Sequence, residues 1–146
     1  MSRLFFADNT VLINFGLAGR IDTLALILNG QGRWVASVEQ EYAASAAKLG
    51  LPGPSVMSEF LGESLRPAGN QIFVDILAFQ QALRGPGDTR EAHLGECETL
   101  AIILHQAPDS YILTDDYDAA RLADAQGVQT LTTWALLRFA VKRNLL

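Results

Sequence analysis

Two short apolar runs of this chain each end in carboxylates. Asp8 follows the run at residues 4–7, and Asp115 and Asp116 follow the run at 111–114. In an open α/β sheet, ligands bind beyond the carboxyl ends of the strands, so we expect these acids to meet at one edge. Burying several carboxylates side by side is costly unless a cation neutralises them. The pattern therefore predicts a sheet edge that carries a hard-metal site.

Strand-like runs alternate with amphipathic, helix-like segments along almost the whole chain, which is typical of a sheet covered by helices. We therefore predict an α/β fold: a three-layer α/β/α sandwich with a short central parallel sheet, formed by one domain over residues 1–146. The predicted strands are 4–7, 33–36, 111–114 and 128–131. The predicted helices are 10–18, 21–28, 37–48, 71–83, 89–105, 117–126 and 133–143.

Two local signals refine this prediction. Ser37 has Gln40 three residues later, which is the pattern of a capping box, so Ser37 is the expected N-cap of its helix. Residues 50–70 hold three of the five prolines. This segment is predicted to be an irregular loop with one short strand near residues 55–60.

Composition narrows the class of protein. The chain has 146 residues, of which 49% are hydrophobic and 18% charged, as expected for a folded domain. No apolar run approaches the ~20 residues that span a bilayer, and Asp8 and Asn9 interrupt the N-terminal apolar stretch, which argues against a signal peptide. The single cysteine, Cys97, excludes an internal disulfide. We expect a cytoplasmic protein with no membrane contact.

The formal net charge of −5 is unusual for a protein that binds nucleic acid. A cluster of site acids would supply much of that negative charge, however, and each bound divalent ion would return two positive charges. The net charge therefore does not exclude a nucleic-acid substrate.

Further acids are placed to reach the same edge. Glu41 lies one turn into the helix predicted at 37–48, and Glu96 lies in the helix that precedes the run at 111–114. Glu98 is two residues from Glu96 on that helix, so the two side chains should not both face one ion. Oxygen-only ligands favour Mg²⁺ or Mn²⁺, and the presence of only two histidines and one cysteine argues against zinc.

The segments ADNTVLINF, VASVEQE, LGECETLAIIL and ILTDDYDAARLADAQGVQTLTTWALLRFAVKRNLL together resemble the PIN-domain family, and most closely its toxin ribonucleases of the VapC type. The resemblance spans nearly the whole chain. It implies that Asp8, Glu41, Glu96 and Asp116 are the catalytic acids. Additional residues that match the family pattern or adjoin it are Thr10, Glu98, Asp115 and Asp118.

The resemblance also implies a function, that of a Mg²⁺- or Mn²⁺-dependent endoribonuclease that acts as the toxin of a toxin–antitoxin pair. Asp8, Glu96 and Asp116 would hold the metal, and Glu41 would hold a second ion or orient the attacking water. Arg121 and Arg138 are candidate contacts to the RNA backbone. An antitoxin protein and a homodimer formed through the apolar C-terminal helix are the implied partners.

Other readings of these residues remain open at this point. Asp8 alone suits the N-cap of the helix at 10–18, and Asp115, Asp116 and Asp118 suit a turn or a helix start. We expect His93 at the surface or in a cap, and Trp134 in the core or an interface. Trp34 is expected in the same kind of environment, and Cys97 in the core.

Alternative functions are a non-catalytic PIN-like interaction domain and, with less support, a phosphatase of the haloacid-dehalogenase type. The phosphatase needs an acid or a similar group at position 10, which is Thr10 here. It also needs a lysine that holds the phosphate, and Lys48 and Lys142 are poorly placed for that role.

Overall fold

Four short strands form a parallel sheet at the centre of the protein, whose computed structural model describes residues 3–146. The strand order is β2-β1-β3-β4, and Ala7 of β1 pairs with Leu113 of β3. Because the strands are parallel, their carboxyl ends share one edge of the sheet. The strands are β1 (Phe5–Ala7), β2 (Gly32–Arg33), β3 (Tyr111–Leu113) and β4 (Thr130–Leu131).

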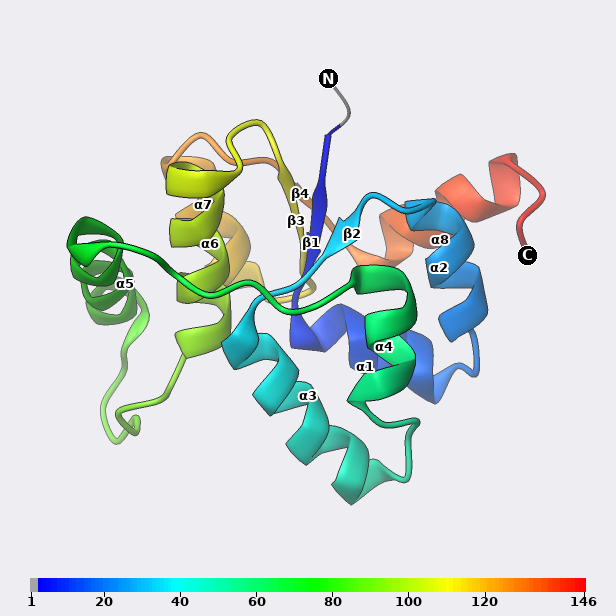
Figure 1. Cartoon of the computed structure of the whole chain (residues 1–146), viewed down its shortest axis with the longest axis horizontal. Helices are drawn as coiled ribbons and strands as arrows, with labels where there is room; N and C mark the ends of the chain where they lie inside the picture. The colour runs from blue at the N-terminus through cyan, green and yellow to red at the C-terminus, as the bar shows by residue number, and fades with distance from the viewer. Residues whose placement is uncertain (1–2) are drawn as a thin grey trace.

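Helices cover both faces of this sheet, which confirms the predicted α/β/α sandwich. In Figure 1, α6 and α7 lie to one side of the sheet, and α2 and α8 lie to the other, with α5 outside α6. The helices of the described chain are α1 (Asn9–Leu17), α2 (Ile21–Leu28), α3 (Ala36–Leu49), α4 (Pro54–Leu61), α5 (Asn70–Leu83), α6 (Leu94–Gln106), α7 (Tyr117–Ala125) and α8 (Thr133–Lys142). Within residues 3–146, none of the helices is both long and apolar enough to cross a membrane.

The strand predicted near residues 55–60 is wrong, because this segment is the helix α4. Pro54 occupies its first turn, where the missing N–H costs nothing. Met57 and Leu61, four residues apart, are both fully buried and so anchor the helix on the core. The chain then returns to the sheet at Leu65, which forms an isolated parallel bridge with Val35.

The predicted start of the third helix is also wrong. Val35 occupies the N-cap position of α3, and Ser37 lies inside the helix. The Ser37 backbone N–H donates instead to the carboxylate of Glu98 on α6, at 3.1 Å. A distant acid has therefore replaced the local cap that the sequence pattern suggested. The second and last strands are also shorter than predicted, because β2 ends at Arg33 and β4 begins at Thr130.

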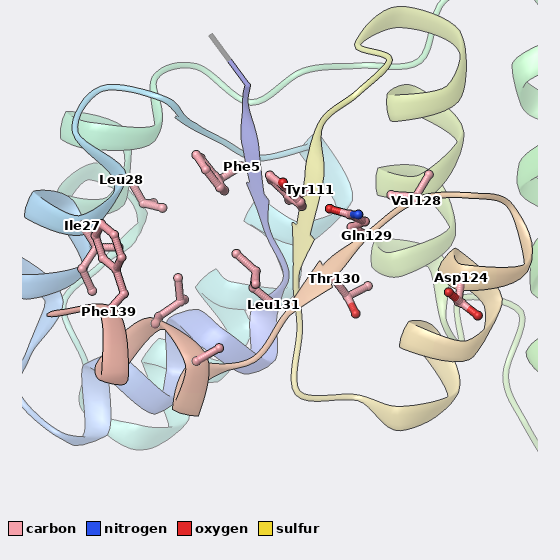
Figure 2. A pocket seen from close by; sticks show the side chains of 12 residues that line it. Phe5, Ile27, Leu28, Tyr111, Asp124, Val128, Gln129, Thr130, Leu131 and Phe139 are labelled. Carbon is pink, nitrogen blue, oxygen red and sulfur yellow. The ribbon is translucent and has the colours of Figure 1, made fainter. Parts of the chain in front are cut away.

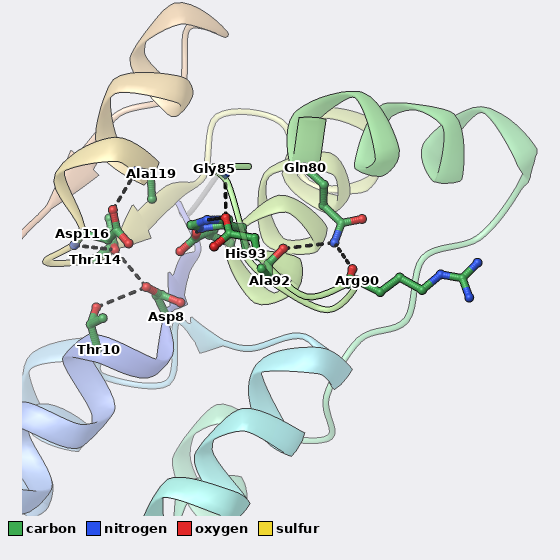
Figure 3. A network of polar contacts seen from close by, with 12 residues as sticks. Asp8, Thr10, Gln80, Gly85, Arg90, Ala92, His93, Thr114, Asp116 and Ala119 are labelled. Carbon is green, nitrogen blue, oxygen red and sulfur yellow. Dashed lines mark hydrogen bonds and ion pairs between the residues drawn. The ribbon is translucent and has the colours of Figure 1, made fainter. Parts of the chain in front are cut away.

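The helix predicted to begin at residue 89 begins at Leu94, because the preceding segment is held by side chains instead. The buried Gln80 amide donates to the carbonyls of Arg90 and Ala92, both at 3.1 Å, as Figure 3 shows. Asp88 accepts from the backbone N–H of Gly85 at 2.7 Å. These bonds satisfy backbone groups in the loop that would otherwise need a helix.

Aromatic side chains fill much of the core. Trp34 is 0% exposed, and its indole Nε1–H donates to the carbonyl of Gly62 at 2.9 Å. Tyr42 is also fully buried, and its hydroxyl donates to the Pro52 carbonyl at 2.6 Å. The core position expected for Trp34 is confirmed, and so is that of Cys97, which is fully buried.

We predict that Gly32→Ala destabilises the protein. A Cβ at this position of β2 would lie 2.8 Å from terminal carbons of both Leu28 and Leu61, which are themselves buried. The overpacking should lower the free energy of unfolding by about 1–3 kcal/mol, measured by urea denaturation. Gly85→Ala is the control, since its Cβ would find no atom closer than 3.8 Å. Equal stability of the two variants would contradict this account of the packing around β2.

Candidate active site

A pocket of about 440 Å³ opens at the carboxyl edge of the sheet, and four acids from four separate elements line it. Asp8 follows β1, Glu41 lies on α3, Glu96 on α6, and Asp116 at the start of α7. The remaining lining residues are Asn9, Thr10, Ala44, Ser45 and His93. The structure therefore brings together all four acids that the sequence singled out.

Asp8 is the most deeply placed of these acids, at 3% exposed. It occupies the N-cap position of α1, yet its side chain makes no capping hydrogen bond there. Its Oδ2 atom instead accepts from the hydroxyls of Thr10 (3.1 Å) and Thr114 (2.9 Å), which Figure 3 shows. Burial raises the pKa of Asp8 even though the Thr114 hydrogen bond opposes that shift. The Asp8 carboxylate is thus turned into the pocket and oriented there by two hydroxyls.

Glu41 and Glu96 carry the clearest electrostatic signature of the pocket. Burial raises the pKa of each to about 7, and the negative charge of Asp8 adds to the shift in both cases. Glu96 further raises the pKa of Glu41, and Asp116 further raises that of Glu96. These acids share a region of low solvent access and repel one another, so bound positive charge would be favourable there.

The position of the Glu41 carboxylate against α6 depends on a glycine. A Cβ added to Gly95 would lie only 2.2 Å from the Oε1 atom of Glu41. The backbone N–H of Gly95 also forms a hydrogen bond that partly offsets the raised pKa of Glu41. Sequence reasoning did not assign a role to Gly95, although its position directly before Glu96 was a usable signal.

Asp116 both caps a helix and lines the pocket. Its Oδ1 atom accepts from the Ala119 backbone N–H at 3.1 Å, at the start of α7. Its own backbone N–H donates to the Thr114 hydroxyl, also at 3.1 Å. The two readings of Asp116 left open by the sequence are therefore compatible.

The acids that adjoin these positions lie outside the pocket lining. Asp115 accepts from the Thr133 backbone N–H at 2.8 Å and from the Asn14 amide at 2.7 Å, so it joins α1 to the start of α8. Asp118 is exposed in the first turn of α7 and lines a separate cavity with Arg121. The Glu98 carboxylate accepts a hydrogen bond from the Ser37 backbone N–H at the N-terminus of α3. Of the two glutamates on α6, the pocket receives Glu96.

His93 occupies a helix-cap position, as expected from the sequence, and it also lines the pocket, which sequence reasoning missed. It has a left-handed backbone (φ 64°) at the N-cap position of α6, and its ring bridges two acids. Nδ1 lies 2.6 Å from Glu96, and Nε2 lies 3.2 Å from Asp88. Burial lowers the pKa of His93, but the two carboxylates outweigh burial and the net shift is upward. The signal in the sequence was its position three residues before Glu96, one helical turn away.

The donor chemistry of the pocket suits a hard cation, because its acids offer only oxygen ligands. Among residues 3–146, however, no three His, Cys, Asp or Glu side chains stand in an arrangement that could hold a metal ion. Like-charged carboxylates without a counter-ion keep apart, so binding would require them to draw together. The pocket acids therefore offer the right ligand atoms for a divalent cation in one place, but they are not yet arranged in a coordination geometry.

A larger and more apolar cavity, of about 710 Å³, lies away from these acids. Figure 2 shows it on the sheet face bordered by α2 and α8, where Phe5 stacks on Tyr111 with 5.3 Å between ring centroids. Phe139 of α8 also lines this cavity. Two other apolar residues of α8, Trp134 and Val141, are exposed.

The parallel sheet between two helical layers is a PIN-like fold. A solved chain of VapBC-1 from nontypeable Haemophilus influenzae shares it, with a TM-score of 0.57 and 14% sequence identity. The similarity covers 90% of this chain and 98% of that chain. No protein-family model matches the sequence, and no curated protein matches it. At this identity the likeness establishes the fold alone.

We predict that the metal-free protein loses stability as the pH rises from about 4.5 to about 7. In this window Glu41 and Glu96 are more protonated in the folded than in the unfolded chain, because folding raises their pKa from 4.5 to about 7. The folded state then binds more protons, so the free energy of unfolding falls with pH. Urea denaturation in EDTA across this range measures the effect. Glu41→Gln should flatten the profile, whereas Glu59→Gln on the exposed surface of α4 should not; a profile that rises with pH would contradict the prediction.

We further predict that Gly95→Ala displaces the Glu41 carboxylate while leaving the fold intact. The added methyl meets the end of a flexible side chain, and Ala is a better helix former than Gly. At pH 5 the stability should therefore stay within about 1 kcal/mol of wild type. The pKa of Glu41, followed by carbon NMR of its carboxyl group, should move down from about 7 as the group leaves its buried position. Gly16→Ala, at a helical glycine of α1, is the matched control, and an unchanged Glu41 pKa in Gly95→Ala would contradict the prediction.

Proposed function

We propose that this protein is a divalent-metal-dependent endoribonuclease. The observation that carries the proposal is the convergence of Asp8, Glu41, Glu96 and Asp116 on one pocket at the carboxyl edge of the sheet. The raised pKa values of Glu41 and Glu96 support it, because strongly perturbed acids in a cleft are characteristic of functional sites. The PIN-like fold and the resemblance to VapC-type ribonucleases point to the same chemistry.

Asp8, Glu96 and Asp116 are the residues that would hold Mg²⁺ or Mn²⁺. When bound, such an ion would polarise the phosphodiester and lower the pKa of a bound water. Thr10 and Thr114 orient the Asp8 carboxylate through their hydroxyls. Glu41, which also lines the pocket, is available to orient the attacking water or to help hold a second ion.

The biological setting that we propose is a toxin–antitoxin pair, with this chain as the toxin. The support is the shared fold with a chain of VapBC-1, together with the VapC-like sequence segments. An antitoxin protein and a second copy of this chain are the expected partners. The apolar cavity on the sheet face, lined by Phe5 and Tyr111, leaves surface for such contacts.

The test is cleavage of a total RNA pool with and without Mn²⁺ or Mg²⁺. Asp8→Asn and Asp116→Asn should each lower cleavage more than about 100-fold, since even residues that only orient metal ligands typically contribute 10–100-fold. Asparagine retains the capping ability that Asp116 needs, so loss of activity would not reflect loss of the helix start. Calorimetric titration with Mn²⁺ should show binding to the wild type and weakened binding to both variants.

Asp118→Asn is the matched control, because this acid lies in the same helix turn but outside the pocket. It should retain wild-type cleavage. Cleavage that persists in EDTA, or an unaffected Asp8→Asn variant, would overturn the proposal. A protein that binds no Mn²⁺ and cleaves no RNA would instead be a PIN-like interaction domain without catalysis.

A further inference from the structure

Two helices that begin at the carboxyl edge of the sheet carry the same pair of residue types. Tyr117 is the first residue of α7 and has Arg121 four positions later. Trp134 is the second residue of α8 and has Arg138 four positions later. Residues four apart share one face of a helix, so Arg121 lies on the same face of α7 as Tyr117, and Arg138 on the same face of α8 as Trp134.

These aromatic rings are unusually open to solvent. Tyr117 is 74% exposed and Trp134 is 68% exposed, the two highest values among the large hydrophobic residues of the described chain. The sequence placed Trp134 in the core or in an interface, and its exposure shows that it does not lie in the core. The guanidinium carbon of Arg121 lies 5.8 Å from the centre of the Tyr117 ring, so this pair is already in contact.

Both pairs are tied to the acid pocket. Tyr117 directly follows Asp116, which lines the pocket. On α8, Thr133 directly precedes Trp134, and the backbone N–H of Thr133 donates to the Asp115 carboxylate. The Asp115 backbone N–H donates in turn to the Thr10 hydroxyl, at 3.1 Å, and Thr10 also lines the pocket. The start of α7 therefore contains a pocket residue, and the start of α8 is linked to the pocket residue Thr10 through Asp115.

We propose that Tyr117 and Trp134 are stacking platforms for the bases of single-stranded nucleic acid, with Arg121 and Arg138 contacting its phosphates. The inference rests on the proposed function and names the substrate form for the same site. Unpaired bases stack on exposed aromatic rings, and the adjoining strand follows positive charge. In a duplex the bases stack on each other, so no base face is free to stack on these rings.

The charge of α8 favours nucleic acid over a second copy of this chain as the occupant of this face. The helix contains Arg138 and Lys142, Arg143 follows at its C-cap, and the helix has no acidic residue. In a two-fold contact through α8, two helices that carry cations and no acids would face each other, which is repulsive. The same charges are complementary to a phosphate backbone.

The two tryptophans of the chain make the inference directly measurable. Trp34 is fully buried, so quenching of tryptophan emission by an added ligand reports on Trp134. The probe is a single-stranded 12-nucleotide oligo(U), titrated in EDTA so that metal-dependent cleavage does not interfere. We expect saturable quenching, with weak or no quenching by a 12-base-pair RNA duplex or by an abasic strand of the same length.

Affinity is then compared among variants by anisotropy of a labelled oligo(U). Trp134→Ala and Tyr117→Ala should each weaken binding roughly 5- to 150-fold, the range expected for loss of one stacked base. Trp134→Phe and Tyr117→Phe should retain most of it. Arg138→Gln should reduce the salt dependence of binding by about one phosphate contact. Leu77→Ala, at an equally exposed apolar position on α5, is the control and should bind like wild type.

Equal affinity for the abasic strand, or wild-type binding by both alanine variants, would overturn the inference. So would a Trp134→Ala variant that changes the oligomeric state in sedimentation while its RNA affinity is unchanged, because the face would then be a protein interface. Failure of the proposed function gives a different pattern. In that case oligo(U) still binds with aromatic dependence, and the wild type with Mn²⁺ leaves RNA intact.

Discussion

The pairing of β1 with β3 is the contact on which the acid pocket depends. The Asp8 backbone N–H donates to the Leu113 carbonyl at 2.9 Å, which extends the strand pairing to the last residues of both strands. This pairing sets Asp8 beside Thr114, although the two are 106 residues apart in the chain. Thr114 then bonds to Asp8 through its hydroxyl hydrogen and accepts from the backbone of Asp116 through the same oxygen. One threonine thereby links two of the pocket acids.

Helix packing adds the rest of the pocket to the β1–β3 pair. The pocket gathers four acidic side chains and therefore concentrates negative charge. Gly95 allows α6 to approach the Glu41 carboxylate, and His93 holds the Glu96 side chain from the loop that Gln80 secures. The arrangement separates two kinds of acid. Asp115 and Glu98 each accept a hydrogen bond from the backbone N–H of a residue at the start of a helix, whereas burial and the negative charge of other pocket acids raise the pKa values of Glu41 and Glu96.

Much of this arrangement was predictable from local patterns. The strand-end positions of Asp8 and Asp116 follow from apolar runs that stop at a carboxylate, and a parallel sheet brings such ends together. The sequence also indicated Glu41, on the helix after the second strand, and Glu96, on the helix before the third strand. The errors occurred where a tertiary contact replaced a local rule. Ser37 does not cap α3 because Glu98 does, and α4 is helical because Met57 and Leu61 bury themselves in the core.

The amino-acid sequence by itself determined the α/β class, the parallel sheet and the strand-end positions of Asp8 and Asp116, because these follow from periodicity and from where each apolar run ends. The resemblance to the PIN-domain family then selected Glu41 and Glu96 among the remaining acids. Only the tertiary structure decided which acids line the pocket and which, such as Glu98 and Asp115, lie outside it. It also decided that His93 enters the pocket and that Trp134 faces solvent. The physical reason is that burial, hydrogen-bond partners and mutual repulsion belong to pairs of residues far apart in the chain. No local pattern records which partner a side chain will meet.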